Sequence, residues 1–306
     1  HQLCDLYTLE NSTLKKESTI ATDRGRIERH IKPLLGKYHC RDVSRAHVER
    51  MRNDIANGKT ATDVKTGFRG RAIIRGGKGT ANKAVSLLGA IFTFAVERDL
   101  RNDNPVRGVK QYSGKKLERY LTTQEMARLG EVLETAEQAG TNPYALAAIR
   151  TLLLTGARRG EILNLRWSEV DFEQSCFRLP DSKTGAKIIQ VGPSVPEYLK
   201  TVPRIEGNPY VFPGRIEGQP LVNLTKIWHS VREAAGLTDV RIHDLRHSYA
   251  SVGATSGESI IILGSILGHA NASTTERYTH LGETPAKAAA RRISDQVDVA
   301  LRGGET

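Results

Sequence analysis

Apolar residues recur every three or four positions over four stretches of the first 112 residues, which is the spacing of one face of an α-helix. In the last of these stretches Val85, Leu88 and Phe92 share a face, and a polar cluster at 102–105 ends it. The pattern therefore predicts a four-helix module. Its helices are expected near 5–10 and over 19–35, 45–56 and 80–100.

Local start and stop signals predict a second helical domain over 122–306, after a polar linker at 113–121. Thr122 and Glu125 have capping-box spacing, Pro143 follows Asn142 at a favoured first helical position, and Gly156 predicts a helix end. Helices are expected from 122, over 144–155, from 158, near 222–235, and over 243–255, 258–267, 273–281 and 285–301.

Alternating β-prone residues at 175–179 and 187–191 predict a β-hairpin, the one clear β feature of the pattern. The predicted fold class is therefore mainly α with a small β component. It consists of a helical domain over 1–112 and an α+β domain over 122–306. The longest apolar runs, such as 145–154, are expected to be too short to cross a bilayer.

Charge divides these two domains. The chain carries a formal net charge of +11, and residues 1–112 hold 22 basic against 12 acidic side chains. The remaining residues hold 23 against 22. A concentrated positive charge in the first domain favours a polyanionic partner. Three scattered cysteines (Cys4, Cys40 and Cys176) predict a reducing, cytoplasmic environment.

The densest basic stretch spans 59–83, where glycines alternate with charges. We interpret it as a flexible loop that follows a phosphate backbone, and a merely solvated loop remains the alternative. A phosphate-binding P-loop is excluded because Ala72 stands where its first glycine should be and Gly79 follows Lys78. The candidate DNA-binding residues are Lys59, Lys65, Arg69, Arg71, Arg75, Lys78 and Lys83.

The second domain carries separated residues that suit attack of a phenol on a phosphodiester. Arginine forks can bind the phosphate oxygens, a lysine or histidine can protonate the leaving oxygen, and a tyrosine can be the nucleophile. The candidates, in chain order, are Arg158 with Glu161, Lys183, His243, Arg246, His269 and Tyr278. The residues offer no carboxylate cluster for a metal ion, so none is expected.

Each of these signals has an ordinary structural explanation when it is taken alone. Arg158 and Glu161 could be a surface helix pair, Lys183 a solvated turn residue, and His269 a residue at a helix end. Tyr278 could be a half-buried aromatic residue with a satisfied hydroxyl. The functional interpretation depends on their joint occurrence and order.

Together these blocks resemble the tyrosine recombinase family of phage-type integrases, over about residues 5–290. The resemblance implies that Arg158, Lys183, His243, Arg246 and His269 surround the phosphate, with Glu161 as the acidic companion of Arg158. It implies that Tyr278 forms a 3′-phosphotyrosyl link and releases a 5′-hydroxyl, without a cofactor.

The resemblance also implies an architecture and partners. The first domain would be a core-binding domain and the second a catalytic domain, closing as a clamp on double-stranded DNA. A homo-tetramer on DNA, accessory DNA-bending proteins and a location in a bacterial host cell, at the nucleoid, are expected. The helix predicted at 285–301 could dock on a neighbouring protomer or on its own domain. Because the chain begins with His1, we expect a fragment that lacks an arm-binding domain.

The leading hypothesis is a site-specific DNA recombinase, the integrase of a prophage or integrative element. A type IB topoisomerase shares the chemistry and remains an alternative. A catalytically silent DNA-binding regulator is the alternative from another class.

Overall fold

The computed structural model describes residues 1–67, 70–114, 118–181 and 185–268, together with Thr275, Tyr278, Ile293, Ser294 and Val297. The chain divides into two compact units, His1–Lys116 and Leu117–Thr306. Each unit has its own hydrophobic core. The helices predicted at 273–281 and 285–301 lie outside the described residues, apart from those five single positions.

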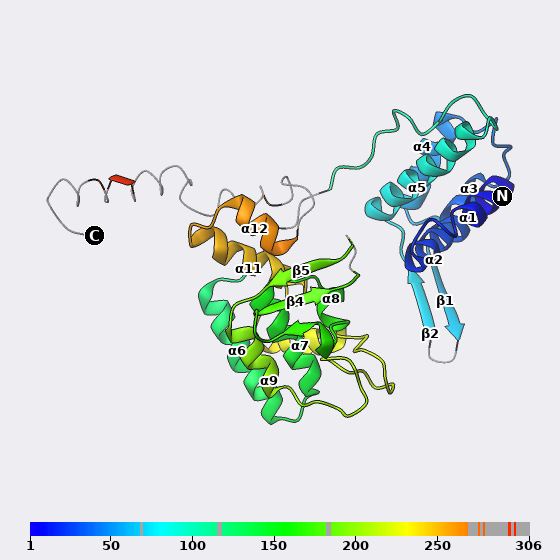
Figure 1. Cartoon of the computed structure of the whole chain (residues 1–306). Coiled ribbons are helices and arrows are strands. Elements are labelled where there is room, and N and C mark those ends of the chain that lie inside the picture. The colour runs from blue at the N-terminus through cyan, green and yellow to red at the C-terminus, as the bar shows by residue number, and fades with distance from the viewer. Residues whose placement is uncertain are drawn as a thin grey trace. The chain divides into compact units, whose positions relative to one another are not determined.

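The first unit is a helical bundle with one β-hairpin (Figure 1). Its elements are α1 (Gln2–Glu10), α2 (Glu17–Arg26), the π-turn η1 (Ile27–Ile31), α3 (Lys32–Leu35), α4 (Arg45–Ala56), β1 (Thr62–Gly67), β2 (Gly70–Ile74) and α5 (Lys78–Glu97). The predicted helix at 19–35 therefore exists as α2, η1 and α3 in direct succession. Ser44 caps α4 by accepting a hydrogen bond from the His47 backbone, as its sequence position suggests.

Helix α5 is the core helix of this unit. By length and composition alone it is apolar enough to cross a membrane, which contradicts the expectation that no apolar run is long enough. Half of the apolar segment of α5 is buried, however, and nine residues of the helix, Ile91 and Phe92 among them, belong to the unit's core. The apolar character of α5 is therefore explained by packing against α1, η1 and α4.

The basic stretch at 59–83 is not a flexible loop, and that prediction is wrong. Strands β1 and β2 pair in antiparallel register, with Val64 opposite Ala72 and Lys65 opposite Arg71. The hairpin extends away from the helices of its unit in Figure 1, and those of its residues whose burial is described are half-exposed or exposed. In β1 the β-branched residues Thr62, Val64 and Thr66 recur at every second position, but the glycine and charge content of the stretch obscured this pattern. The hairpin at 175–191 is therefore not the only β feature.

The second unit combines a small antiparallel sheet with helices. Its elements are α6 (Thr123–Gln138), α7 (Pro143–Thr155), α8 (Arg159–Leu163), the 3₁₀ turn η2 (Trp167–Glu169), β3 (Val170–Asp171), β4 (Cys176–Leu179), β5 (Lys187–Gln190), α9 (Ser194–Thr201), α10 (Thr225–Ala234), α11 (Asp244–Thr255) and α12 (Ile260–Leu267). The strand order is β3-β4-β5, so a third strand joins the predicted hairpin. Helix α9 was not predicted.

The predicted caps of this unit are confirmed. Thr122 and Glu125 form both hydrogen bonds of a capping box, and the Asn142 side chain caps α7. Gly156 ends α7 in the left-handed conformation, with φ of 60°. These signals succeed because each depends on a few neighbouring residues.

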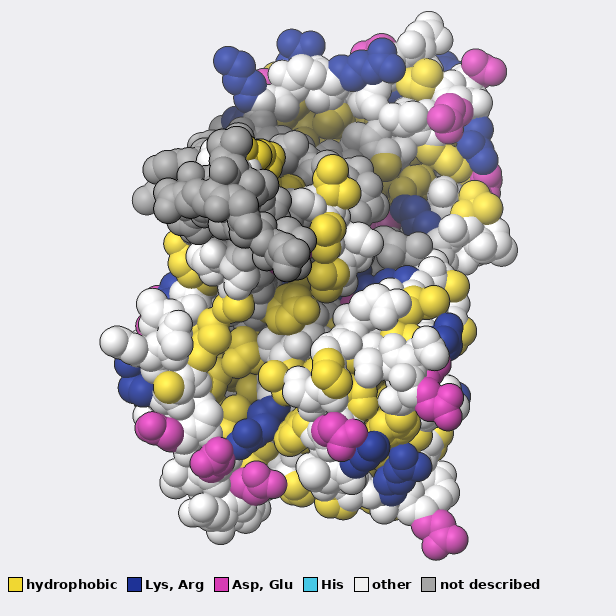
Figure 2. Space-filling model, turned by 60° about the vertical axis from the view of Figure 1, so that its left-hand side comes forward, with side chains coloured by type: hydrophobic (Ala, Val, Ile, Leu, Met, Phe, Trp, Pro, Cys, Tyr) yellow, Lys and Arg dark blue, Asp and Glu magenta, His cyan; other side chains and the backbone are white. Residues whose placement is uncertain are grey.

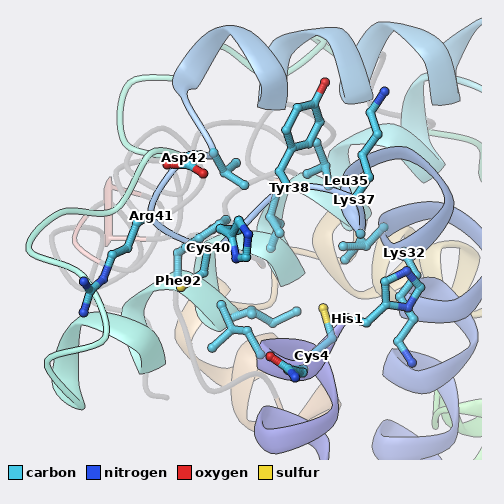
Figure 3. A pocket seen from close by; sticks show the side chains of 18 of the residues that line it. His1, Cys4, Lys32, Leu35, Lys37, Tyr38, Cys40, Arg41, Asp42 and Phe92 are labelled. Atoms are coloured by element: carbon cyan, nitrogen blue, oxygen red, sulfur yellow. The ribbon is translucent and has the colours of Figure 1, made fainter.

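A hollow of about 1060 Å³ opens in the first unit, between α1, α3, the segment 36–43 and α5 (Figure 3). Cys4, Leu35, Tyr38 and Phe92 are among the residues that line it. The hollow belongs to the first unit, whereas the candidate catalytic residues belong to the second.

Replacement of Gly156 by alanine should destabilise the second unit. A Cβ atom there would lie 2.6 Å from the Tyr249 ring, and the positive φ disfavours any side chain. We expect a loss of about 1–3 kcal/mol in the free energy of unfolding, measured by chemical denaturation. Gly160→Ala is the matched control because its Cβ would meet nothing within 4 Å and its φ is ordinary. Equal stability of the two variants would contradict this explanation.

Candidate active site

Arg158 is held at the turn between α7 and α8. Its backbone N–H donates to Oε2 of Glu161 at 2.9 Å, and its Nη1 donates to Oε1 of the same carboxylate at 3.0 Å. Its Nη2 donates to the carbonyl oxygen of Gly268 at 3.0 Å, just after α12. The Arg158 side chain remains 25% exposed, so the fixed guanidinium can still be reached from solvent.

Arg246 is the most deeply buried cation of the site. It lies on α11, is 4% exposed, and donates from Nη1 to the Gly156 carbonyl and from Nη2 to the Leu267 carbonyl, both at 2.7 Å. These carbonyls end α7 and α12, where backbone groups carry the negative end of the helix dipole. Burial, together with the charge of Arg158, lowers the pKa of Arg246 to about 10, so it stays charged at neutral pH.

Lys187, which sequence analysis did not single out, completes the charged cluster. It begins β5, and its Nζ lies 2.7 Å from Oε1 of Glu161, with 14% of the lysine side chain exposed. Burial lowers the pKa of Lys187 and the Glu161 contact opposes that effect. Burial raises the pKa of Glu161, but hydrogen bonds from Lys187 and Arg158 outweigh it and hold the value below the ordinary range.

His243 lies at the first turn of α11, beside Arg246. His243 is an exposed residue, but the surrounding protein partly shields its ring from solvent. This burial lowers the pKa of His243, and the charge of Arg246 lowers it further, while Asp244 acts in the opposite direction. Burial and the charge of Arg246 therefore both favour the neutral imidazole. Its ring meets the ring of His247 edge to face, with centroids 5.1 Å apart.

Tyr278 is buried against α11 and α12. It is 4% exposed and belongs to a small core with Ala250, Ala254, Leu263 and Leu267. Its hydroxyl lies 2.5 Å from Nδ1 of His247, a second residue that sequence analysis missed. The Tyr278 side chain also lies within electrostatic reach of Arg246.

The structure thus brings Arg158, Glu161, His243, Arg246 and Tyr278 together where α7, α8, α11, α12 and β5 meet. Lys183 and His269 lie outside the described residues. Both missed residues had weak signals in the sequence. Lys187 follows Lys183 by four positions, and His247 directly follows Arg246, one helical turn after His243.

The candidate DNA-binding residues lie in the first unit, on and around the β1–β2 hairpin. Lys59 and Arg71 form ion pairs with Asp54 and Asp63, which reduces their net charge, and Arg69 lies outside the described residues. On the face drawn in Figure 2, the described Lys and Arg side chains are interspersed with acidic and hydrophobic ones.

The side chains of the site form a cationic cluster. Within the described ranges, no group of three or more His, Cys, Asp or Glu side chains lies close enough to hold a metal ion. The groups that converge are two guanidiniums, an ammonium, imidazoles and a phenol. Such a set can bind a phosphodiester and stabilise the charge that develops when it is attacked.

Comparison with known proteins agrees with this chemistry. The model of the phage integrase family matches residues 119–284, more than half of the chain. The putative prophage phiRv2 integrase of Mycobacterium tuberculosis is 29% identical over 293 residues, which cover 87% of this chain and 70% of that protein. Prophage integrase IntF of Escherichia coli K12 is 29% identical over 185 residues, and the match covers 59% of this chain and only 39% of IntF.

The fold agrees as well. A solved structure of lambda integrase residues 75–356, a dimer bound to a COC′ core site, superposes with a TM-score of 0.66. The sequence identity is 18%, and the superposition covers 90% of this chain and 96% of that one. The chain belongs to the phage integrase family of tyrosine recombinases.

Removal of the Glu161 charge should destabilise the second unit in a pH-dependent way. In Glu161→Gln the partly buried Lys187 and Arg158 lose their shared carboxylate, and we expect a loss on the order of 2–3 kcal/mol near neutral pH. The folded-state pKa of Glu161 lies below its unfolded value, so its stabilisation is present above the unfolded pKa. It disappears as the pH falls through the folded pKa.

The measurement is the free energy of unfolding of both proteins between pH 3 and pH 7. Glu197→Gln is the control, because Glu197 pairs with Lys200 on the surface and should contribute less than about 1 kcal/mol. A difference between wild type and Glu161→Gln that does not shrink at low pH would contradict the assigned role.

Proposed function

We propose that this chain is a site-specific DNA recombinase, the integrase of a prophage or integrative element. The observation that carries the proposal is the convergence of Arg158 and Arg246 beside the buried hydroxyl of Tyr278. The family match favours this function over a type IB topoisomerase or a silent regulator. The similar prophage integrase and the lambda integrase structure bound to a core site support DNA as the substrate class.

In this proposal Tyr278 attacks a phosphodiester and forms a 3′-phosphotyrosyl link, while the bond to the 5′-oxygen breaks. An arginine has five N–H donors, and two of those of Arg246 bind carbonyls, so others remain for a phosphate oxygen. Arg158 binds a second oxygen and Glu161 fixes its orientation. Lys183 protonates the leaving 5′-oxygen, and His243 and His269 border the phosphate.

The domains have separate roles. Residues 1–112 form the core-binding domain, 113–121 the linker, and 122–306 the catalytic domain. The first domain holds duplex DNA through the basic hairpin and its neighbours. A homo-tetramer on DNA is proposed by analogy with lambda integrase, one structure of which is a tetramer on a Holliday junction. Accessory DNA-bending proteins and a location in the bacterial cytoplasm, at the nucleoid, complete the proposal.

Tyr278→Phe should bind DNA as wild type does and form no covalent adduct. One hydroxyl is a small part of a large phosphate interface, yet it supplies the nucleophile. The assay incubates protein with a nicked suicide substrate and separates denaturant-resistant complexes on a gel. Tyr249→Phe is the control, because it removes another phenolic hydroxyl of the same unit, one that has no role in the proposed chemistry. An adduct formed by Tyr278→Phe would place the nucleophile elsewhere.

Neutralisation of the hairpin should weaken binding to every DNA sequence. Combined replacement of Arg69, Arg71 and Arg75 by glutamine should also flatten the dependence of log affinity on log salt, by about 0.9 per lost phosphate contact. Fluorescence anisotropy across a salt series measures both effects.

A control variant removes the same number of charges elsewhere in the first unit. Lys15, Lys32 and Arg98 each bind a carboxylate of that unit, and their replacement by glutamine should leave the salt slope close to wild type. Equal losses in the two triple variants would show that net charge, and not the hairpin, determines affinity.

A further inference from the structure

His247 makes the closest polar contact to the candidate nucleophile among the described residues. Its Nδ1 lies 2.5 Å from the Tyr278 hydroxyl, within hydrogen-bond distance for an O–H donor. Both side chains are buried, with 8% of His247 and 4% of Tyr278 exposed. A hydrogen bond that is shielded from water is electrostatically stronger than the same hydrogen bond between exposed side chains.

The two rings are held by their surroundings. His247 projects from α11 with its ring against the ring of His243, and Tyr278 packs among Ala250, Leu263 and Leu267. The Tyr278 backbone N–H donates to the carbonyl of Thr275, whose side chain is fully buried. The hydroxyl and the imidazole nitrogen are therefore positioned before any substrate binds, which is what a proton-transfer pair requires.

We propose that His247 is the base that takes the proton of Tyr278 during strand cleavage. This inference rests on the proposed function, in which Tyr278 is the nucleophile. The phenolic O–H bond breaks, the proton moves to Nδ1 of His247, and a bond forms between the Tyr278 oxygen and phosphorus. The bond from phosphorus to the 5′-oxygen breaks, and that oxygen takes its proton from Lys183. In rejoining, the His247 imidazolium returns the proton to the departing phenolate.

The charges around the pair fit this transfer. Arg246, within electrostatic reach of Tyr278, favours the phenolate. The phosphate under attack gains negative charge beside the same groups, which offsets the cost of the imidazolium. His243 is also close to Arg246, but it is His247 whose ring nitrogen contacts the hydroxyl.

The decisive variants are His247→Ala and His247→Gln, assayed in single turnover on the nicked suicide substrate. General-base catalysis contributes about 10²–10⁴-fold, so both variants should cleave at least about 100-fold more slowly than wild type. Glutamine can accept a hydrogen bond from Tyr278 through its amide oxygen but cannot take the proton. If His247 only positioned the phenol, glutamine at this position would therefore restore the rate of cleavage. DNA affinity and thermal unfolding of the Gln variant should match wild type.

Two chemical substitutions separate a base from other roles. Replacement of Tyr278 by the more acidic 3,5-difluorotyrosine should restore cleavage of His247→Ala by at least about tenfold, because that phenol needs less help to ionise. A substrate with sulfur as the leaving atom should rescue Lys183→Ala and leave the His247 variants slow. His229→Ala, at an exposed histidine on α10, is the control and should cleave normally.

Wild-type cleavage by His247→Gln, or failure of difluorotyrosine to restore His247→Ala, would overturn the proposal. Faster cleavage by His247→Ala would also overturn it and would show that His247 restrains the phenol. If the wild-type chain forms no covalent adduct, the proposed function itself fails. If wild type forms the adduct through Tyr278 and only the His247 results differ, the function stands and this inference falls.

Discussion

The second unit is organised around a buried arginine that two helix ends neutralise. Arg246 donates to the last carbonyls of α7 and α12, and those carbonyls have no partner within their own helices. A buried guanidinium without such acceptors would be strongly destabilising. The position of α7 relative to α12 is therefore tied to the presence of a cation between them. The candidate catalytic residues follow from this constraint, because Gly156 leads to Arg158 and Gly268 follows Leu267.

Opposite charges also offset one another around Arg158. Arg158 and Lys187 share the Glu161 carboxylate. Because Lys187 begins β5, this contact holds the start of β5 against α8. The cluster retains a net positive charge once Arg246 is included. A cluster with that surplus of positive charge, beside a buried phenol, suits a phosphodiester better than a neutral ligand. Stability and the proposed chemistry thus depend on the same side chains.

Much of the fold could be predicted from sequence because its signals are local. The caps at Thr122 and Asn142 and the left-handed glycine at 156 each involve a few neighbouring residues. The β1–β2 hairpin was predicted to be a loop. Its two strands pair with each other and are exposed, so neither strand has the run of apolar residues that marks a buried strand in a sequence. Helix α9 was missed for want of comparable start and stop signals.

The candidate site was predictable in part. The order of the blocks, through their resemblance to a family, pointed to the arginines and to Tyr278. Lys187 and His247 could not be found this way, since their significance depends on Glu161 and Tyr278, which lie far from them along the chain. Contacts that join distant segments are visible only once the fold brings the segments together.

The most direct measurement identifies the atom that joins protein to DNA. The wild-type chain is trapped on a suicide substrate, the complex is digested with nuclease and trypsin, and the modified peptide is sequenced by mass spectrometry. The account predicts a 3′-linked nucleotide on Tyr278, in the peptide that begins at that residue and ends at Lys287. A nucleotide on any other residue, or one linked through its 5′-phosphate, would contradict it.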